Sequence, residues 1–261
     1  MTIQTLVSCV NQDMNTIAEK MNLQTDAIVI NQCEENAYQE YMYHGNLIQC
    51  YSFCERGVGL SRNNALLRAS ADLILFSDED IVYEDGYAEK IKVAFEDNPD
   101  KDFLLFNFEV DESRQTYHIE KETKISLFNS GRYPTYSFAL RRESVIKNNI
   151  TFSLLFGGGA KYSNGEDSLF IKDCLKAGMK IKAMPVNLGR EIHRPSTWFH
   201  GYTEKFFYDR GVLYVYLYGM MAKPFAMRFM LKHKNKLKNT PESISYKQAV
   251  NAIMKGIDDT K

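Results

Sequence analysis

Two acidic motifs hold the side chains of this chain that are best suited to chemistry. The first is Asp78-Glu79-Asp80, which directly follows an apolar run at residues 73–76. In an extended backbone Asp78 and Asp80 point to one side and Glu79 to the other. Mg²⁺ and Mn²⁺ take oxygen ligands and complete their shells with water and substrate phosphates, so one or two carboxylates suffice. The motif predicts a clamp for a metal-bound diphosphate; an acidic turn that only solubilises a loop or caps a helix is the alternative.

The second motif is Asn164-Gly165-Glu166-Asp167, which precedes an amphipathic segment that ends at Gly178. Both acids then lie in or near the first turn of a helix, where the helix dipole favours their ionised form. Asp167 can act as a base that removes the proton from an acceptor hydroxyl. The alternative is that the two acids only stabilise the helix, by about 0.3–1 kcal/mol each.

A third candidate is Arg62, which lies at the start of a helix predicted at residues 61–69. Gly57 and Gly59 precede it and allow a close approach of the backbone to a ligand. A helix N-terminus with an arginine suits a phosphate or a polar ring. The full Gly-x-Gly-x-x-Gly of dinucleotide sites is missing. An ion pair between Arg62 and a surface carboxylate is the alternative.

The elements that must position these groups alternate between strand and helix. Strands are predicted at residues 4–10, 26–30, 47–53, 73–76, 103–110, 136–141 and 180–185, and the first helix at residues 13–21. Such alternation is typical of an α/β fold with a mostly parallel central sheet flanked by helices, whose ligands bind beyond the carboxyl ends of the strands. Val10, Asn11, Asn31 and Asp78 would then line one rim.

Composition narrows the classes of function. The chain has 261 residues, 44% of them hydrophobic and 25% charged, which suits one large or two modest globular domains. A net charge of −1 argues against nucleic acid as the main partner. Five cysteines without a Cys-x-x-Cys pair predict reduced thiols. No signal peptide and no spanning segment of roughly 20 apolar residues is found, so a cytoplasmic location is expected.

The composition changes near residue 203. An aromatic helix is predicted at residues 206–221, a break at Lys223-Pro224, a basic amphipathic stretch at residues 225–238 and a last helix at residues 244–257. Such a basic stretch can lie on an anionic membrane surface, where each basic residue adds about 1 kcal/mol. A helix that packs on the domain or on a dimer partner is the alternative.

Taken together, the motifs resemble those of the family-2 glycosyltransferases, which have the Rossmann-like GT-A fold. The resemblance rests on strand ends at Asn11 and Asn31-Gln32 and on residues 59–66, 75–82 and 164–170, in the order of the family. It covers residues 3–200. It implies an inverting transfer of a sugar from a nucleotide diphosphate donor to a hydroxyl, with Mn²⁺ or Mg²⁺ on the diphosphate. The Gln-x-x-Arg-Trp signature of processive synthases is absent, which favours transfer of a single sugar.

The resemblance also implies roles for the two acidic motifs. Asp80 would bind the metal directly, Asp78 and Glu79 would face the donor, Glu166 would serve the acceptor and Asp167 would be the base. One departure concerns the nucleotide base, because family members carry acidic residues where this chain has Asn31-Gln32. An amide can still accept from and donate to a pyrimidine edge. Uridine is favoured, while thymidine and guanosine stay open.

Two further residues follow the last predicted strand. His193 resembles the histidine that some GT-A enzymes place near the metal, and imidazole can join carboxylate at Mn²⁺. A hydrogen-bonded structural histidine is the alternative. Trp198 could stack on a sugar face or pack as an ordinary aromatic side chain. The glycines at residues 157–159 predict a mobile loop near the site, and residues 111–131 are expected to select the acceptor.

These patterns predict a catalytic domain at residues 1–200, with a donor half at 1–82 and an acceptor half at 83–200, and a helical extension at 201–261. The expected enzyme adds a sugar to a glycan or lipid-linked acceptor in surface polysaccharide synthesis, in the cytoplasm or on the inner face of the cell membrane. A non-catalytic relative that binds sugar nucleotides or glycans is one alternative. A sugar nucleotidyltransferase is another, although its Gly-rich, Arg-bearing loop is missing from residues 10–25. The sequence does not predict the oligomeric state.

Overall fold

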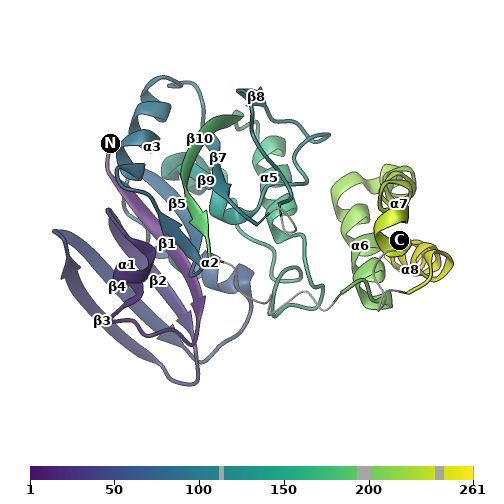
Figure 1. Cartoon of the computed structure of the whole chain (residues 1–261), viewed down its shortest axis with the longest axis horizontal. Coiled ribbons are helices and arrows are strands. Elements are labelled where there is room, and N and C mark those ends of the chain that lie inside the picture. The colour runs from purple at the N-terminus through teal and green to yellow at the C-terminus, as the bar shows by residue number, and fades with distance from the viewer. Residues whose placement is uncertain (112–114, 193–200, 239–243, 261) are drawn as a thin grey trace.

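The computed structural model describes residues 1–111, 115–192, 201–238 and 244–260 and has the predicted α/β architecture (Figure 1). The strands are β1 Ile3–Val10, β2 Asp26–Gln32, β3 Ala37–Tyr43, β4 Asn46–Phe53, β5 Leu73–Asp78, β6 Ile81–Tyr83, β7 Phe103–Glu109, β8 Thr123–Lys124, β9 Phe138–Arg141 and β10 Ile181–Glu191. The α-helices are α1 Ile17–Met21, α2 Val58–Arg68, α3 Tyr87–Glu96, α4 Arg142–Lys147, α5 Glu166–Lys176, α6 Glu204–Tyr218, α7 Ala222–Lys238 and α8 Tyr246–Asp258. Two short 3₁₀ helices are η1 Thr135–Ser137 and η2 Gly219–Met221.

The central sheet has the strand order β3-β4-β2-β1-β5-β9-β7-β10-β6, and β8 pairs with β10. Strands β4, β2, β1, β5, β7 and β10 run in one direction, which confirms a mostly parallel arrangement. The strand at residues 138–141 differs from this expectation, because β9 runs antiparallel between β5 and β7. The pairing shows the reversal, because Phe138 lies beside Leu105 of β7 and Arg141 lies beside Leu73 at the start of β5.

Helices cover both faces of the sheet. Strand β5 shows why, since its apolar side chains alternate between the two faces and all of them are buried. Leu73 and Leu75 belong to the apolar cluster under α1 and α3, whereas Ile74 and Phe76 belong to the cluster under α2, α4 and α5. A continuous apolar run is what a strand buried on both faces requires.

The helices α6, α7 and α8 form a bundle beside α5 (Figure 1) with an apolar cluster of its own. Two glycines bring α6 and α8 close together. A Cβ atom on Gly211 would lie 2.1 Å from the carbonyl oxygen of Ile253, and one on Gly256 would lie 2.1 Å from that of Tyr208. Across the described part of the chain, every helix is too short or too polar to cross a membrane.

The break between the two predicted C-terminal helices lies earlier than expected. It falls at Gly219–Met221, and Pro224 lies in the first turn of α7. Proline is tolerated there, because the backbone N–H groups of a first helical turn have no acceptor within the helix. The hairpin strand β3 was missed, because its residues alternate between exposed and half-buried positions and include no apolar run.

Candidate active site

The site is built on the carboxyl ends of β1, β2 and β5. The strand register places Val10 beside Gln32 and Ser8 beside Asp78, so the predicted rim exists. Helix α2 is held on this rim by a hydrogen bond of 3.0 Å from the Ser61 hydroxyl to the Ser8 hydroxyl. The first turn of α2 therefore lies at the end of β5, where the first acidic motif begins.

Arg62 connects the two acidic motifs. Its Nη2 atom lies 2.9 Å from Asp78 Oδ1, and its Nη1 atom lies 2.9 Å from Glu166 Oε1. The side chain is buried, and its guanidinium carbon lies 5.4 Å from the centroid of the Phe152 ring. Burial opposes its charge, but the two carboxylates prevail and raise the pKa of Arg62. The arginine predicted to meet the donor is thus bound to a carboxylate of each motif.

Glycines bring the loop before α5 onto the loop before α2. The Val58 N–H donates to the carbonyl oxygen of Gly158 at 2.8 Å. A Cβ atom on Gly159 would lie 2.9 Å from the backbone nitrogen of Gly57, and one on Gly157 would lie 2.9 Å from Glu166 Oε2. The loop that the sequence predicts to be mobile is packed against its neighbour in this structure, and its mobility stays a prediction. Contact with the side chains of Val58 and Glu166 is the physical reason for Gly157, and contact with the backbone of Gly57 is the reason for Gly159.

Asp167 lies in the first turn of α5, after Gly165, whose φ of 113° is in the left-handed region. Its Oδ1 atom accepts a hydrogen bond of 2.5 Å from the backbone N–H of Ser168. Burial, followed by the negative charge of Glu166, raises the pKa of Asp167 to about 6. The helix start was expected to favour the ionised form, but burial outweighs it. A carboxyl group with such a pKa can accept a proton near neutral pH.

Asp80 lies in the turn between β5 and β6, so the alternation expected for an extended chain stops at Asp78. Its carbonyl oxygen accepts a hydrogen bond of 2.7 Å from Ile192, next to the pairing of Ile81 with Glu191. Glu191 is a residue that the sequence reasoning missed. The one feature of the sequence that could have indicated Glu191 is its position at the end of the last strand of the sheet.

The pKa of the Tyr136 hydroxyl is affected by the acidic residues of this region. Burial first, then the charges of Tyr117, Glu191, Asp78 and Asp80, raise its pKa. Acidic residues from β5, from the turn after it and from β10 therefore act on one phenol.

Asp78 and Asp80, at and after the end of β5, suit a metal ion that is also bound by the phosphates of a substrate. Within the described ranges, no three His, Cys, Asp or Glu side chains gather as a ready metal cage. A divalent ion on a diphosphate needs only one or two protein carboxylates, because the phosphates supply further oxygens. Asp80 and Asp78 match that donor set. His193 and Trp198 lie outside the described residues, so their predicted roles stay predictions.

The amides at the end of β2 hold the rim together. Asn31 accepts from the backbone N–H of Gln12 at 3.1 Å and donates to its carbonyl oxygen at 3.2 Å. Gln32 donates to the carbonyl oxygen of Gly57 at 3.1 Å. Asn11 is exposed beside them with a left-handed φ of 50°. To bind a nucleotide base through its side chain, Asn31 would have to give up its hydrogen bonds to the backbone of Gln12.

Helix α6 supports the loop that leads to Glu166. Asp209 is buried, and its Oδ2 atom accepts from the backbone N–H of Ser163 at 2.9 Å and from Lys205 Nζ at 2.6 Å. A Cβ atom on Gly165 would lie 2.5 Å from the methyl groups of Leu213. The predicted C-terminal extension therefore contacts the second acidic motif directly, which no local sequence pattern indicates.

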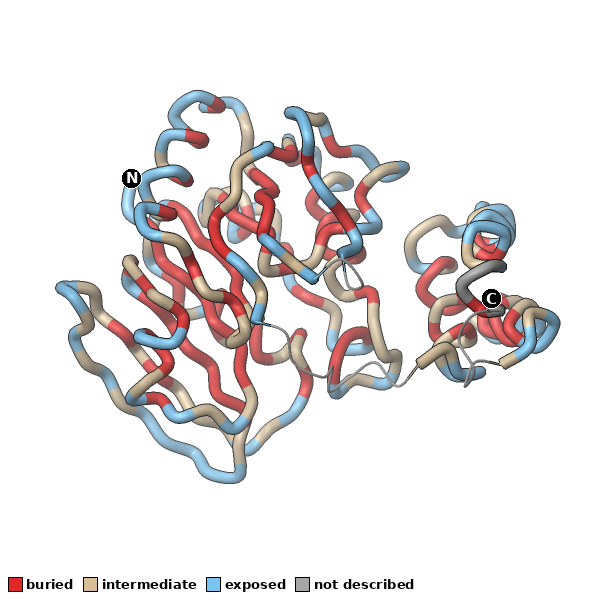
Figure 2. The backbone as a smooth tube through the Cα atoms, in the orientation of Figure 1, coloured by how far each residue is buried: buried red, intermediate tan, exposed pale blue. Residues whose placement is uncertain are grey.

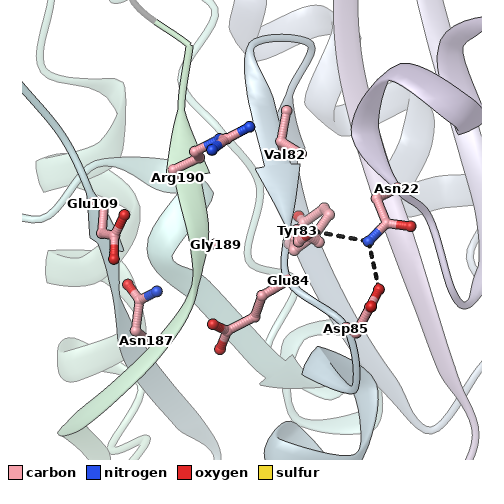
Figure 3. Close-up of a pocket in the computed structure, with 9 residues that line it drawn as sticks. All are labelled: Asn22, Val82, Tyr83, Glu84, Asp85, Glu109, Asn187, Gly189 and Arg190. Atoms are coloured by element: carbon pink, nitrogen blue, oxygen red, sulfur yellow. Dashed lines mark hydrogen bonds between the residues drawn. The ribbon is translucent and has the colours of Figure 1, made fainter.

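A cavity of 330 Å³ lies along β6, which follows the acid turn (Figure 3). Figure 3 shows Glu84 and Asn187 at one end of it and Arg190 with Val82 at the other. Asn22 donates to the Tyr83 carbonyl oxygen and to Asp85 Oδ1, both at 3.0 Å. The two acidic motifs do not line this cavity, so it borders the candidate site without forming part of it.

Comparisons with known proteins support the fold. No family model and no curated protein matches the sequence. Among solved structures, residues 1–349 of TarS from S. aureus in complex with UDP-GlcNAc align with 16% identity and a TM-score of 0.65, over 98% of this chain and 82% of that fragment. The mannosyltransferase PcManGT from Pyrobaculum calidifontis, in complex with GDP-Man and Mn²⁺, aligns with 10% identity and a TM-score of 0.51, over 99% and 86% of the two chains. At these identities the likeness shows a shared fold.

Proposed function

We propose that the chain is a metal-dependent, inverting glycosyltransferase of the family-2 type. One observation carries the proposal: Arg62 joins Asp78 to Glu166, so the two acidic motifs meet on one rim. The structures that share the fold hold UDP-GlcNAc in one case and GDP-Man with Mn²⁺ in the other. A rim with carboxylates for a metal and a separate carboxylate for a proton suits transfer from such a donor.

The residues divide the chemistry among them. Asp80 and Asp78 would hold Mn²⁺ or Mg²⁺, which neutralises charge on the leaving diphosphate when bound. Asp167 takes the proton from the acceptor hydroxyl as the hydroxyl oxygen attacks the anomeric carbon. Glu166 is bound by Arg62, which leaves Asp167 as the base. A single attack from the face opposite the leaving group inverts the anomeric centre.

The donor is most simply a uridine diphosphate sugar, as in the TarS complex. We assign the acceptor to the hydroxyls of a glycan or of a lipid-linked sugar, in the synthesis of a surface polysaccharide on the cytoplasmic side of the membrane. His193 joins the metal and Trp198 contacts the acceptor in this proposal.

A screen of nucleotide sugars tests the proposal. We expect a donor to raise the melting temperature in the presence of Mn²⁺ and to release its nucleoside diphosphate slowly. Asp80→Ala should lose both effects, whereas Asp97→Ala, which changes an exposed acid at the end of α3, should keep them. If Asp80→Ala binds the donor with Mn²⁺ as tightly as the parent, the clamp is wrong. Tight binding with no turnover on any acceptor would favour a non-catalytic relative.

A further inference from the structure

The outer face of α7 and of the short 3₁₀ helix η2 before it carries apolar side chains that are exposed to water. Met220 is 100% exposed, Leu231 65%, Met221 55% and Met227 38%. These residues, together with Pro224, Arg228 and Lys232, are called the α7 outer face below. Figure 2 shows exposed residues along this side of the helix bundle. A contiguous patch of exposed apolar side chains often marks a surface that binds a partner or a membrane.

The opposite side of α7 accounts for the packing of the helix. Ala222, Ala226 and Met230 are buried in the cluster that α7 shares with α6 and α8. With 3.6 residues per turn, Pro224, Met227 and Leu231 form a stripe on the side away from these residues. The helix therefore has one apolar face that is used in the fold and a second that is not.

Positive charge borders the exposed stripe. Arg228 and Lys232 flank it on one side, and both are exposed. On the other side Lys223 pairs with Asp258 at 2.9 Å, and Lys234 lies 5.8 Å from the centroid of the Tyr246 ring. The sequence contains no Asp or Glu between residues 210 and 241. Apolar side chains between basic ones match a hydrocarbon layer beneath anionic headgroups.

The exposed apolar surface continues toward the catalytic part. Phe128 is 82% exposed, and its ring centroid lies 6.4 Å from that of Phe225 in α7. Phe225 in turn stacks on Tyr218 at 3.9 Å. Phe128 belongs to the segment at residues 111–131 that was expected to select the acceptor. One surface thus joins the helix bundle to the loop on the acceptor side.

We propose that the α7 outer face binds the surface of an anionic lipid membrane. Met220, Met221, Met227 and Leu231 enter the boundary between headgroups and acyl chains, while Arg228 and Lys232 contact the headgroups. An anionic surface accounts for the basic residues, and a hydrocarbon interior accounts for the apolar ones. The inference does not depend on the reaction that the site performs.

Vesicle sedimentation of the full chain tests this inference without donor or acceptor. We expect partition onto phosphatidylcholine vesicles that contain phosphatidylglycerol, much less onto phosphatidylcholine alone, and a decrease as salt is added. The double substitution Arg228→Gln and Lys232→Gln should weaken partition about 30-fold, since each basic residue near an anionic surface adds about 1 kcal/mol. Leu231→Gln should weaken partition at every salt concentration.

Matched controls replace exposed residues elsewhere on the molecule. Lys20→Gln with Lys147→Gln removes two exposed charges, and Leu67→Gln changes a leucine of α2 that is 77% exposed. These variants should bind vesicles like the parent, and circular dichroism should show that every variant is folded.

Three results would overturn the inference. The first is no partition at low salt, and the second is partition that the α7 substitutions leave unchanged. The third is another occupant of the same surface in the absence of vesicle binding. Self-association that Leu231→Gln abolishes would assign the surface to a second copy of the chain. Binding of double-stranded DNA that the charge substitutions abolish would assign it to a polyanion.

Discussion

Arg62 shows how one side chain can join two acidic motifs that lie far apart in the sequence. It is buried between Asp78 and Glu166, at 2.9 Å from each. A buried arginine with two carboxylates is costly to desolvate, and removal of one partner leaves unpaired charge behind. The contact therefore fixes the two carboxylates relative to each other. Arg62 is a positioning residue in this interpretation, and the charged groups around it also act on Asp167.

Asp167→Asn should separate chemistry from binding. Asparagine keeps the oxygen that accepts from the Ser168 N–H but cannot take up a proton at this position. Turnover should fall by about 10²–10⁴-fold, while the dissociation constant of the donor changes little. Kinetics at saturating donor with a working acceptor decide the point. Turnover near that of the parent would remove Asp167 from the mechanism and direct attention to Glu166.

The pH dependence of transfer should show the raised pKa of Asp167. The base is active when ionised, so kcat/KM should fall below about pH 6 and level off above it. The positive charge of Arg62 lowers the pKa of Asp167, so Arg62→Met should move the midpoint to higher pH. Arg141→Met is the control, because Arg141 pairs with Leu73 at the start of β5, the opposite end of that strand from Asp78. A midpoint that Arg62→Met leaves in place would contradict this coupling.

At the scale of elements, glycines connect the loop before α2 to the loop before α5. Gly159 and Gly178 have almost the same backbone, with φ of 78° and 81°. A Cβ atom on Gly159 would meet the backbone of Gly57, whereas one on Gly178 would meet nothing within 4 Å. Substitutions at the two positions therefore distinguish the cost of a left-handed backbone from the cost of a steric clash.

We expect Gly178→Ala to lower the free energy of unfolding by about 1 kcal/mol, the cost of a left-handed alanine. Gly159→Ala should cost more and should also reduce transfer, because the loop before Glu166 must shift. Denaturant unfolding and steady-state kinetics of both variants measure the difference. If both variants lose the same free energy of unfolding, the loops before α2 and α5 can move apart without cost.

The sequence predicts the elements of this fold better than their contacts. The apolar run at residues 73–76 and the acidic residues after it are local patterns, and they predict β5 and the acidic motif at its end. The pairing of Arg62 with Glu166 spans 104 residues and depends on the strand order, which no local pattern specifies. The strand β9 was predicted, within residues 136–141, but its reversed direction was missed for the same reason. Its four residues have the composition of any buried strand, and its direction follows from the path of the chain before it.

At the scale of the whole molecule, the C-terminal bundle is part of the support of the site. The predicted boundary near residue 200 separates the apolar cluster of the bundle from the two clusters of the sheet, but a fourth cluster joins Phe156 and Leu169 to Leu213 of α6. Asp209 binds the backbone of Ser163, and Leu213 packs on Gly165. The extension and the second acidic motif should therefore respond together to changes in α6.

Asp209→Ala tests this link. It leaves the buried N–H of Ser163 without its acceptor, so the free energy of unfolding should fall by about 1–3 kcal/mol. Transfer should also slow, with donor binding unchanged, because the loop before Glu166 loses its anchor. Glu204→Ala is the matched control, since it removes an exposed acid from the first turn of the same helix and should cost less than about 1 kcal/mol. Parental kinetics in Asp209→Ala would show that α6 supports stability alone.

The reversed strand β9 has a consequence for how the protein is made. On the ribosome β5 emerges long before residues 138–141, and at about 5–20 residues per second the interval lasts for seconds. During that time β5 is paired with β1 on one side only. An apolar strand with an open edge is a template for pairing with other nascent chains. Slow synthesis at low temperature would prolong this exposure, whereas low expression would reduce encounters between chains. The yield of native protein should therefore rise when the concentration of nascent chains is lowered at a fixed speed of translation.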